Sequence, residues 1–219
     1  MAGRWVAALA IATVGCGATS VGRAPSAPQK TTADTTASAK RAFHRLSSRP
    51  DWLFPFDACP ADAFPAVEKL VPFAAGQEAL DADASLDRCR ANDANACYGA
   101  ALQAQQLKVP SDYAEALFSR ACSLGLVTAC TNRAAGLVNA ASPQSDPWPC
   151  ANRTFEAMCG HDDPWACTMW GGSLVRGRGV PKDVGAARKV LPKGCLLGED
   201  DPACEAARKL LREADAPSI

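Results

Sequence analysis

Apolar and small residues recur at helical spacing around four pairs of cysteines in the last two-thirds of the chain. Alanine precedes the second cysteine of every pair, and a large apolar residue (Phe118, Phe155 or Leu191) stands four positions before the first cysteine in three units. Offsets of four residues place these side chains on the cysteine's own helical face. The pattern predicts two short antiparallel helices in each unit. The cysteine pairs are Cys89/Cys97, Cys122/Cys130, Cys159/Cys167 and Cys195/Cys204.

The spacing of the pairs predicts a stack of such units. The first cysteines recur after 33, 37 and 36 residues, and a period of this size is typical of solenoids built from small supersecondary units. We therefore expect an all-α solenoid of antiparallel helix pairs, with each cysteine pair at the corner between two units. The expected helices span 63–73, 76–90, 95–105, 113–123, 128–140, 151–159, 164–175, 184–192 and 202–214.

The cysteine spacing favours disulfides over zinc. A turn of about seven residues between two helices can bring two Cα atoms within disulfide range. C-x7-C does not match the C-x2–4-C knuckles of zinc sites, and the chain has two histidines. We expect no metal and no cofactor. If Cys16 carries a lipid, Cys59 and Cys150 remain, and elimination alone pairs them with each other.

The N-terminus predicts export. A short positive segment is followed by an apolar stretch from Trp5 to Val14 and by Thr-Val-Gly before Cys16. This pattern resembles a bacterial lipoprotein signal with Cys16 as the lipidated residue, while an ordinary signal peptide is the alternative. Ten apolar residues are too few to span a bilayer. We expect a lipid-anchored protein in the periplasm or at the outer membrane, or else a secreted one.

Composition divides the rest of the chain. Residues 1–15 are the expected signal peptide, and residues 16–48, rich in Ser, Thr, Ala and Pro, are expected to be a disordered tether. Residues 49–90 are expected to form an irregular and helical N-terminal cap, residues 91–214 the solenoid and residues 215–219 a tail. The aromatic cluster of Trp52, Phe54 and Phe56 either caps the open end of the solenoid or forms a ligand platform, and we favour the cap.

The third unit resembles a Sel-1-like repeat. It contains Trp170-Gly171, then Gly-Arg-Gly-Val-Pro-Lys-Asp from Gly177, and Lys-Gly-Cys-Leu-Leu-Gly from Lys193. The paired cysteines are similar to the cysteine-rich secreted branch of that family, known from Helicobacter. The resemblance implies a tetratricopeptide-like solenoid whose concave face binds proteins. On the first helix of each unit it nominates Tyr98, Gln103, Asn132, Arg133, Met169 and Trp170, although Tyr98 and Trp170 could instead fill packing gaps.

Charge and motifs narrow the function. Lys plus Arg and Asp plus Glu both number 23, so no basic surface for nucleic acid is expected. The cysteine-rich branch includes proteins described as β-lactam-binding or weakly β-lactam-hydrolysing, but this chain lacks Ser-x-x-Lys and Lys-Thr-Gly. A thiol–imidazole pair of Cys159 and His161 is a weaker alternative to a disulfide and a solvated corner histidine. We expect an interaction scaffold for an unidentified protein partner, with no catalytic residues; the alternative is a β-lactam-binding protein.

Overall fold

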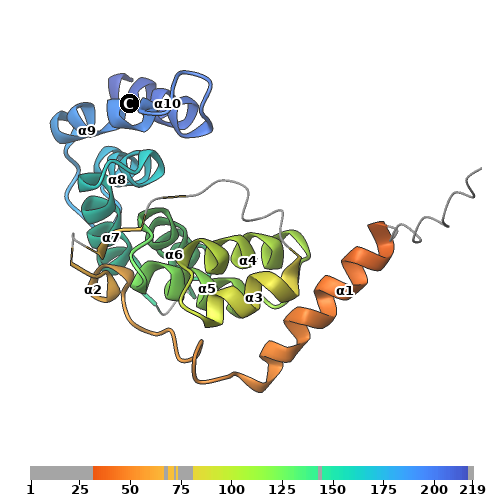
Figure 1. Ribbon diagram of the computed structural model, residues 1–219. Coiled ribbons are helices and arrows are strands. Elements are labelled where there is room, and N and C mark those ends of the chain that lie inside the picture. Colours follow the sequence, from red (N-terminus) through yellow and green to blue (C-terminus); the bar gives the residue numbers. More distant parts are fainter. Residues whose placement is uncertain (1–31, 67–68, 72, 74–80, 143–144, 217–219) are drawn as a thin grey trace, which may run out of the picture. The chain divides into compact units, whose positions relative to one another are not determined.

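The computed structural model describes residues 32–66, 69–71, 73, 81–142 and 145–216, and these residues form helices and connecting turns without a strand (Figure 1). The α-helices are α1 (Thr32–His44), α2 (Pro60–Ala63), α3 (Ala82–Arg90), α4 (Ala94–Gln106), α5 (Ser111–Ser123), α6 (Val127–Asn139), α7 (Trp148–Gly160), α8 (Pro164–Arg176), α9 (Val184–Val190) and α10 (Pro202–Asp215). The described part of the chain also contains the 3₁₀ helices η1 (Arg45–Ser48) and η4 (Leu191–Cys195). The all-α prediction is confirmed.

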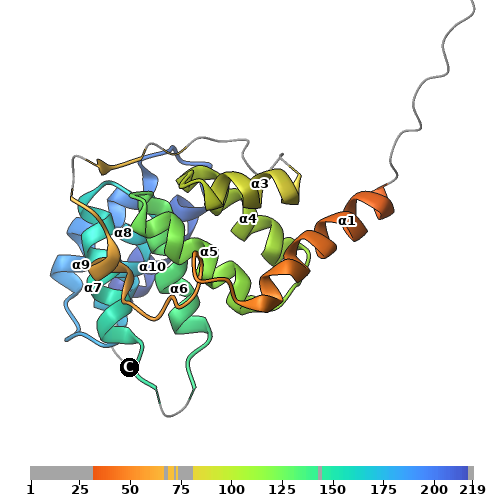
Figure 2. The same ribbon diagram turned by 60° about the horizontal axis from the view of Figure 1, so that its bottom comes forward.

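Consecutive helices pack against each other from α3 to α8, and α8 packs against α9, η4 and α10 (Figures 1 and 2). The large apolar residues of the sequence pattern, Phe118, Phe155 and Leu191, are all buried between these helices. The alanines before the second cysteines are fully buried as well, and their small side chains let neighbouring helices approach closely. The expected helix 184–192 is shorter than predicted, because the chain changes to a 3₁₀ helix around Pro192.

The four corners share one backbone geometry. The residue three positions after the first cysteine has a positive φ in every corner: 70° at Asn92, 100° at Gly125, 59° at Asp162 and 112° at Gly198. Its N–H donates to the carbonyl oxygen of that first cysteine at 2.9–3.1 Å. Glycine, asparagine and aspartate are the residues that tolerate positive φ best. The corners are therefore encoded by local sequence as well as by the cysteines.

Aspartates cap the helices that follow three of the corners. The Asp93 and Asp163 side chains accept hydrogen bonds from the amides of Ala96 and Ala166, and Asp201 accepts one from Ala203. These donors are the alanines of the repeat. At Asp93 burial acts to raise the pKa, but the hydrogen bonds from the Ala96 amide and from Arg88 outweigh it and lower the pKa. Acidic side chains therefore open these three helices, where they accept from free backbone amides and face the positive end of the helix dipole.

Five disulfides cross-link the fold, and all five pairings are those predicted from the sequence. The corner pairs Cys89–Cys97, Cys122–Cys130, Cys159–Cys167 and Cys195–Cys204 have Cα–Cα distances of 4.5, 4.7, 4.6 and 4.3 Å, respectively. The fifth disulfide joins Cys59 to Cys150 at a Cα–Cα distance of 5.8 Å and spans 91 residues. It ties the segment before α3 to the start of α7.

The corner at Cys130 differs from the others, although the sequence predicts equivalent corners. Leu126 stands where the other corners have an aspartate, so no side chain caps α6. Cys130 Sγ lies 3.6 Å from the carbonyl oxygen of Leu126, one turn back along its own helix. At the first and third corners the second sulfur instead lies 3.6 Å from the carbonyl oxygen of the first cysteine. Cys130 nevertheless forms the expected disulfide, because the corner backbone is the same.

The predicted tether is wrong from Thr32 onward. Residues 32–48 form α1 and η1, and the compact unit of the chain begins at Thr32. Ala42, Phe43 and Leu46 are buried in the same core as α3 to α5, and Arg45 forms an ion pair with Asp83 of α3. A few apolar side chains at helical spacing are enough to order this segment once α3 offers a surface. Residues 16–31, including Cys16, lie outside the described residues.

The predicted helix 63–73 is also wrong in the described residues. The helical turn α2 ends at Ala63, and Phe64 continues in an extended conformation because a residue before proline disfavours the α region. Of the expected helix 76–90, α3 begins at Ala82, and residues 76–80 lie outside the described part. Residues 49–66 and 69–71 instead form a strap across other helices, and this name is used below.

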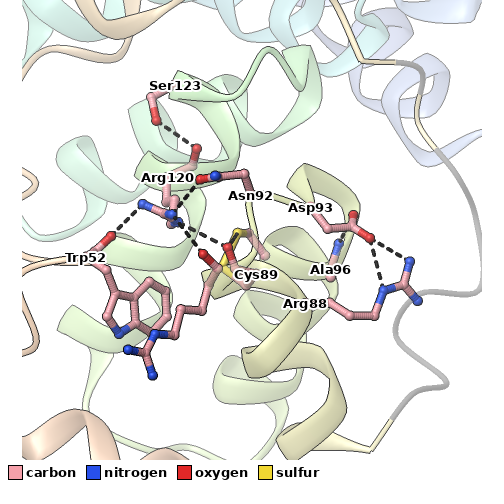
Figure 3. Close-up of a disulfide and its surroundings, with 10 residues drawn as sticks. Trp52, Arg88, Cys89, Asn92, Asp93, Ala96, Arg120 and Ser123 are labelled. Carbon is pink, nitrogen blue, oxygen red and sulfur yellow. Dashed lines mark hydrogen bonds and ion pairs between the residues drawn. A yellow bond between two sulfur atoms is a disulfide. The ribbon is translucent and has the colours of Figure 1, made fainter.

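The strap packs over α5, α6 and α7. Figure 3 shows the Arg120 guanidinium of α5 between the strap and the first corner, where it donates to the carbonyls of Trp52 at 2.5 Å and Cys89 at 3.2 Å and to Asn92 Oδ1 at 2.7 Å. Burial lowers the pKa of Arg120. Farther along, the Ala61 amide donates to Thr154 Oγ1 of α7 at 3.2 Å. The strap therefore runs along the stack rather than ending on its first unit.

The aromatic cluster of the strap is packing material. Leu53 and Phe54 are buried in the main core, and Trp52 and Phe56 pack against it. Arg49 lies 4.2 Å from the Phe54 ring centroid, and Arg133 of α6 lies 5.2 Å from that of Phe56. The cluster therefore packs on the helices, while Trp52 and Phe56 also line a surface cavity of about 120 Å³ beside Arg120.

Candidate functional site

A groove crosses the helices that begin at the corner disulfides. It consists of two adjoining cavities, one of about 310 Å³ bounded by α6, α7, α8 and α10 and one of about 290 Å³ bounded by α4, α6 and α8. Ala135, Trp165 and Met169 line both cavities. The two cavities therefore adjoin at these three residues, and together they are called the groove below.

The groove residues share one register relative to the second cysteine of each unit. On both α6 and α8 they include the positions two before, one after, two after and five after that cysteine, which is Cys130 on α6 and Cys167 on α8. These offsets lie on one helical face, because a helix turns about 100° per residue. Equivalent helices thus present equivalent positions to the same site. The residues are Thr128, Thr131, Asn132 and Ala135 on α6 and Trp165, Thr168, Met169 and Gly172 on α8.

Large exposed apolar side chains mark the middle of the groove. Trp165 is 43% exposed and Met169 is 38% exposed, one turn apart on α8. Phe155, Trp148 and Leu210 continue the apolar lining into the larger cavity. An indole and a thioether left in water at a concave site are the kind of side chains that anchor a partner in protein interfaces.

The end of the groove at α4 and α6 is polar. Asn132 Nδ2 donates to Tyr98 Oη and to the carbonyl oxygen of Thr128, both at 3.1 Å. The Thr131 side chain also lines this cavity and is 4% exposed, and its hydroxyl has no hydrogen-bond partner among the described residues. Buried hydroxyls are nearly always paired, so Thr131 stands out in this site.

The opposite end of the groove is basic. Arg176, Arg178 and Lys209 line the larger cavity, and no acidic residue lines either cavity in the described part of the chain. Arg176 donates to both carboxylate oxygens of Glu213 at 2.9 and 2.7 Å, and this hydrogen bonding raises the pKa of Arg176 and lowers that of Glu213. Among the described residues no carboxylate lies within ion-pair distance of Arg178 or Lys209, although both charges act on Glu213 and help to lower its pKa.

Trp148 and Arg178 are held in place by close packing. The Arg178 guanidinium lies 5.7 Å from the Trp148 ring centroid, and the Arg178 carbonyl accepts a hydrogen bond from Asn152 Nδ2 at 2.7 Å. Gly179 has a φ of 67°, and a Cβ there would overlap Trp148. This glycine is therefore needed for the loop to approach α7.

Three of the six nominated partner-binding residues line the groove. Tyr98, Asn132 and Met169 do so, whereas Gln103, Arg133 and Trp170 line neither cavity. Arg133 is buried and its Nη1 lies 3.1 Å from Glu115 Oε2, and burial raises the pKa of Glu115 although the Arg133 charge and hydrogen bond oppose the shift. Trp170 is half-buried and packs against two core clusters, in agreement with the packing alternative.

The sequence analysis missed two prominent groove residues, Trp165 and Lys209. Trp165 stands two positions before Cys167, and Lys209 stands five positions after Cys204. Both offsets belong to the shared register of the groove, so extending that register from the cysteines would have found them. The nominated residues followed from the analogy with a concave surface, which does not fix this register.

The alternative chemistry at Cys159 and His161 gains no support. Cys159 is disulfide-bonded to Cys167, so it carries no thiol, and the His161 ring is half-buried with its centroid 5.3 Å from that of Phe64. Within the described residues, no three His, Cys, Asp or Glu side chains are grouped to hold a metal ion. Nor is any helix of that part long and apolar enough to cross a membrane.

Comparison of the chain with protein-family models, with curated proteins and with solved structures finds no match. The class of protein therefore rests on the fold and the site. The chain is an all-helical, repeat-like protein whose consecutive helices are joined by corner disulfides. Five disulfides are compatible with an oxidising, exported environment.

Proposed function

We propose that this chain is an exported helical repeat protein of the Sel-1-like class and that it binds another protein through the groove. The exposed Trp165 and Met169 between the two cavities carry this proposal. Their burial by a partner removes apolar surface from water. The shared register supports it as well, since successive units add equivalent positions to one binding surface, as solenoids do.

The test is site-specific photo-cross-linking in the native host. A photoreactive amino acid replaces Met169 in one variant and Leu197 in a control, which is 73% exposed at the last corner and lies outside the groove. We expect protein adducts from position 169 and none from position 197. Adducts from position 197 alone would place the binding surface elsewhere and refute the proposal.

A second arm uses Trp165→Ala in the strain that carries the photoreactive group at position 169. Because more than half of the Trp165 surface is buried, its truncation should lower the free energy of unfolding by about 2–3 kcal/mol, and circular dichroism verifies that the variant is folded. We expect the adduct to disappear, since interface tryptophans often contribute about 2 kcal/mol or more to binding. An adduct of unchanged yield would mean that the groove is not the binding surface.

We further propose that the protein is attached to the bacterial envelope through a lipid on Cys16, in the periplasm or at the outer membrane. The residues before Cys16 in the sequence and the disulfide content support this. Cys16→Ser should move the protein from the membrane fraction to the soluble periplasmic fraction and remove a diacylglyceryl-sized mass. A variant that stays in the membrane fraction would refute the anchor and leave the groove proposal untouched.

A further inference from the structure

We infer that the ligand of the groove is a short, extended protein segment in which carboxylate side chains flank a large apolar side chain. The inference rests on the proposed function and specifies the partner's chemistry. It follows from three properties of the groove: its size, its excess of positive charge and an unpaired hydroxyl at its polar end.

Size favours a segment of chain over a domain surface. The two cavities measure about 310 and 290 Å³ and meet at Trp165 and Met169. Each lies near the lower end of the ~300–1,000 Å³ range of ligand sites. A folded domain presents a broad convex surface that would reach few of these positions. A segment that crosses α8 can place one large apolar side chain beside Trp165 and Met169.

The positive charge of the groove favours acidic residues beside the apolar side chain of the ligand. The whole chain has as many acidic as basic residues, yet the groove is lined by three cations and, in its described part, by no carboxylate. Glu213 pairs with Arg176 and also lies in the field of Arg178 and Lys209, so three cations share this one carboxylate. Arg178 and Lys209 therefore provide the attraction for carboxylates of a ligand. Two available cations are too few to follow a nucleic-acid backbone, which requires a longer basic surface.

The unpaired hydroxyl indicates an extended segment. The Thr131 side chain lines the polar cavity, and its buried Oγ1 has no partner in the described chain. Because Thr131 lines the cavity, a rotation of about 120° about χ1 to another staggered position can bring its hydroxyl to face the cavity. There it can accept from a backbone N–H or donate to a carbonyl. An extended segment offers both groups, whereas a helix uses them internally.

The first experiment selects ligands without assuming their sequence. The full, disulfide-bonded chain is immobilised and challenged with random dodecapeptides displayed on phage. We expect enrichment of Asp or Glu within two positions of Trp, Phe, Leu or Met. Enrichment of basic or uncharged sequences, or of no sequence at all, would overturn the inference. The strongest peptide is then synthesised with its Gln and Asn counterpart, and binding is measured by fluorescence anisotropy.

Two charge variants test the basic end. The double variant Arg178→Gln/Lys209→Gln should weaken the acidic peptide about tenfold, as expected for two partly exposed charge pairs. The matched control Lys182→Gln/Lys189→Gln removes two exposed cations that do not line the groove, and it should bind like the wild type. The Gln and Asn peptide should not distinguish the two variants. If both double variants lost the same amount of affinity, the effect would come from the net charge of the protein rather than from the groove, and the inference would be overturned.

A third pair tests the hydroxyl. Thr131→Val should weaken the peptide about threefold to tenfold, the range of one neutral hydrogen bond. Ser85→Ala in α3 removes another buried hydroxyl that has no partner among the described residues and lines neither cavity, and it should leave binding unchanged. Circular dichroism verifies that both variants are folded. Unchanged binding by Thr131→Val would overturn the extended alignment of the segment.

The outcomes separate this inference from the proposed function. Adducts from position 169 together with a selection that yields non-acidic peptides would keep the protein-binding role and overturn the acidic segment. An acidic lipid surface is examined with vesicles that contain phosphatidylglycerol. If the vesicles bind and the Arg178→Gln/Lys209→Gln variant loses them while no peptide is selected, the groove recognises a membrane and the inference is wrong.

Discussion

Gly125 and Gly198 occupy the same position in two corners, three residues after the first cysteine, but only Gly125 is covered by the strap. Their φ angles are 100° and 112°, so both sites strain any residue that has a Cβ. A Cβ at Gly125 would overlap the carbonyl oxygen of Lys69, while nothing lies within 4 Å of a Cβ at Gly198. Gly125→Ala and Gly198→Ala therefore differ in the packing of the strap on the corner.

The structure sets the magnitude of each change. Positive φ costs a residue with a Cβ about 1–3 kcal/mol, and the reduced entropy of the unfolded chain returns about 0.4–1 kcal/mol. Gly198→Ala should thus lower the free energy of unfolding by about 1–2 kcal/mol. At Gly125 the new methyl must also displace the strap backbone, whose Val71 amide donates to the Gly125 carbonyl at 3.0 Å. Overpacking and a weakened hydrogen bond add about 2–3 kcal/mol.

The assay is urea unfolding under non-reducing conditions, followed by far-UV circular dichroism. Parallel curves with equal slopes would show that both variants expose the same surface, so the midpoints report stability directly. We expect the Gly125→Ala midpoint to fall well below that of Gly198→Ala. Equal midpoints, or a lower midpoint for Gly198→Ala, would refute the close packing of the strap on this corner.

Three further predictions concern the contacts that hold the fold together. Replacing Cys59 and Cys150 by Ala should cost about 4–5 kcal/mol in thermal or urea unfolding because the two lie 91 positions apart in the sequence, against about 2–3 kcal/mol for a corner pair that lies eight positions apart; equal losses would contradict this ranking. Arg120→Met should cost about 2–4 kcal/mol by removing hydrogen bonds to buried carbonyls, whereas Arg153→Met, which removes an exposed ion pair, should cost about 1 kcal/mol or less. Burial raises the pKa of Glu115 above its usual 4.5. On raising the pH, the Glu115 carboxyl therefore loses its proton in the unfolded chain before it does so in the folded chain, and the free energy of unfolding falls as the pH rises above about 4.5. Glu115→Gln should remove this part of the pH dependence in unfolding curves.

The corners could be predicted because local sequence encodes them. The two cysteines of a corner, the aspartate four residues before Cys97 or Cys167 and the buried alanine one residue before each all fall within eight positions of sequence. Cys130 shows that the aspartate is dispensable, since its disulfide forms without one. Corner geometry thus depends on few distant contacts. The helices around the corners followed from the same spacing, with boundaries that differ from the observed ones by a few residues.

The segment before α3 could not be predicted because distant contacts decide its conformation. Phe43 and Leu46 order α1 only by packing in the core shared with α3 to α5, and composition alone favours a tether. The path of the strap depends on the bond from Cys59 to Cys150 and on hydrogen bonds to α5 and α7. Elimination supplied the pairing of the cysteines, but the pairing does not show where the intervening chain runs.

Only half of the residues nominated from the sequence line the groove, and the geometry of the helices explains why. Asn132 and Met169 both stand two residues after a second cysteine, and this offset faces the groove. Arg133 and Trp170 follow one residue later, about 100° farther around the helix, and pack elsewhere. Choosing residues by chemical type mixed the two faces. A fixed offset from the cysteines separates them.

The same helical arithmetic explains why the groove is open. On α6, Thr131 and Arg133 are about 200° apart, so they face opposite sides of the helix. Arg133 faces Phe56 of the strap, and Thr131 lines the groove. The chain thus covers one side of α6 with its own aromatic residues and leaves Trp165 and Met169 exposed on the groove side. Within the described residues the strap is held on the other side of α6 by the bond from Cys59 to Cys150, and it leaves Trp165 and Met169 to the partner that we propose.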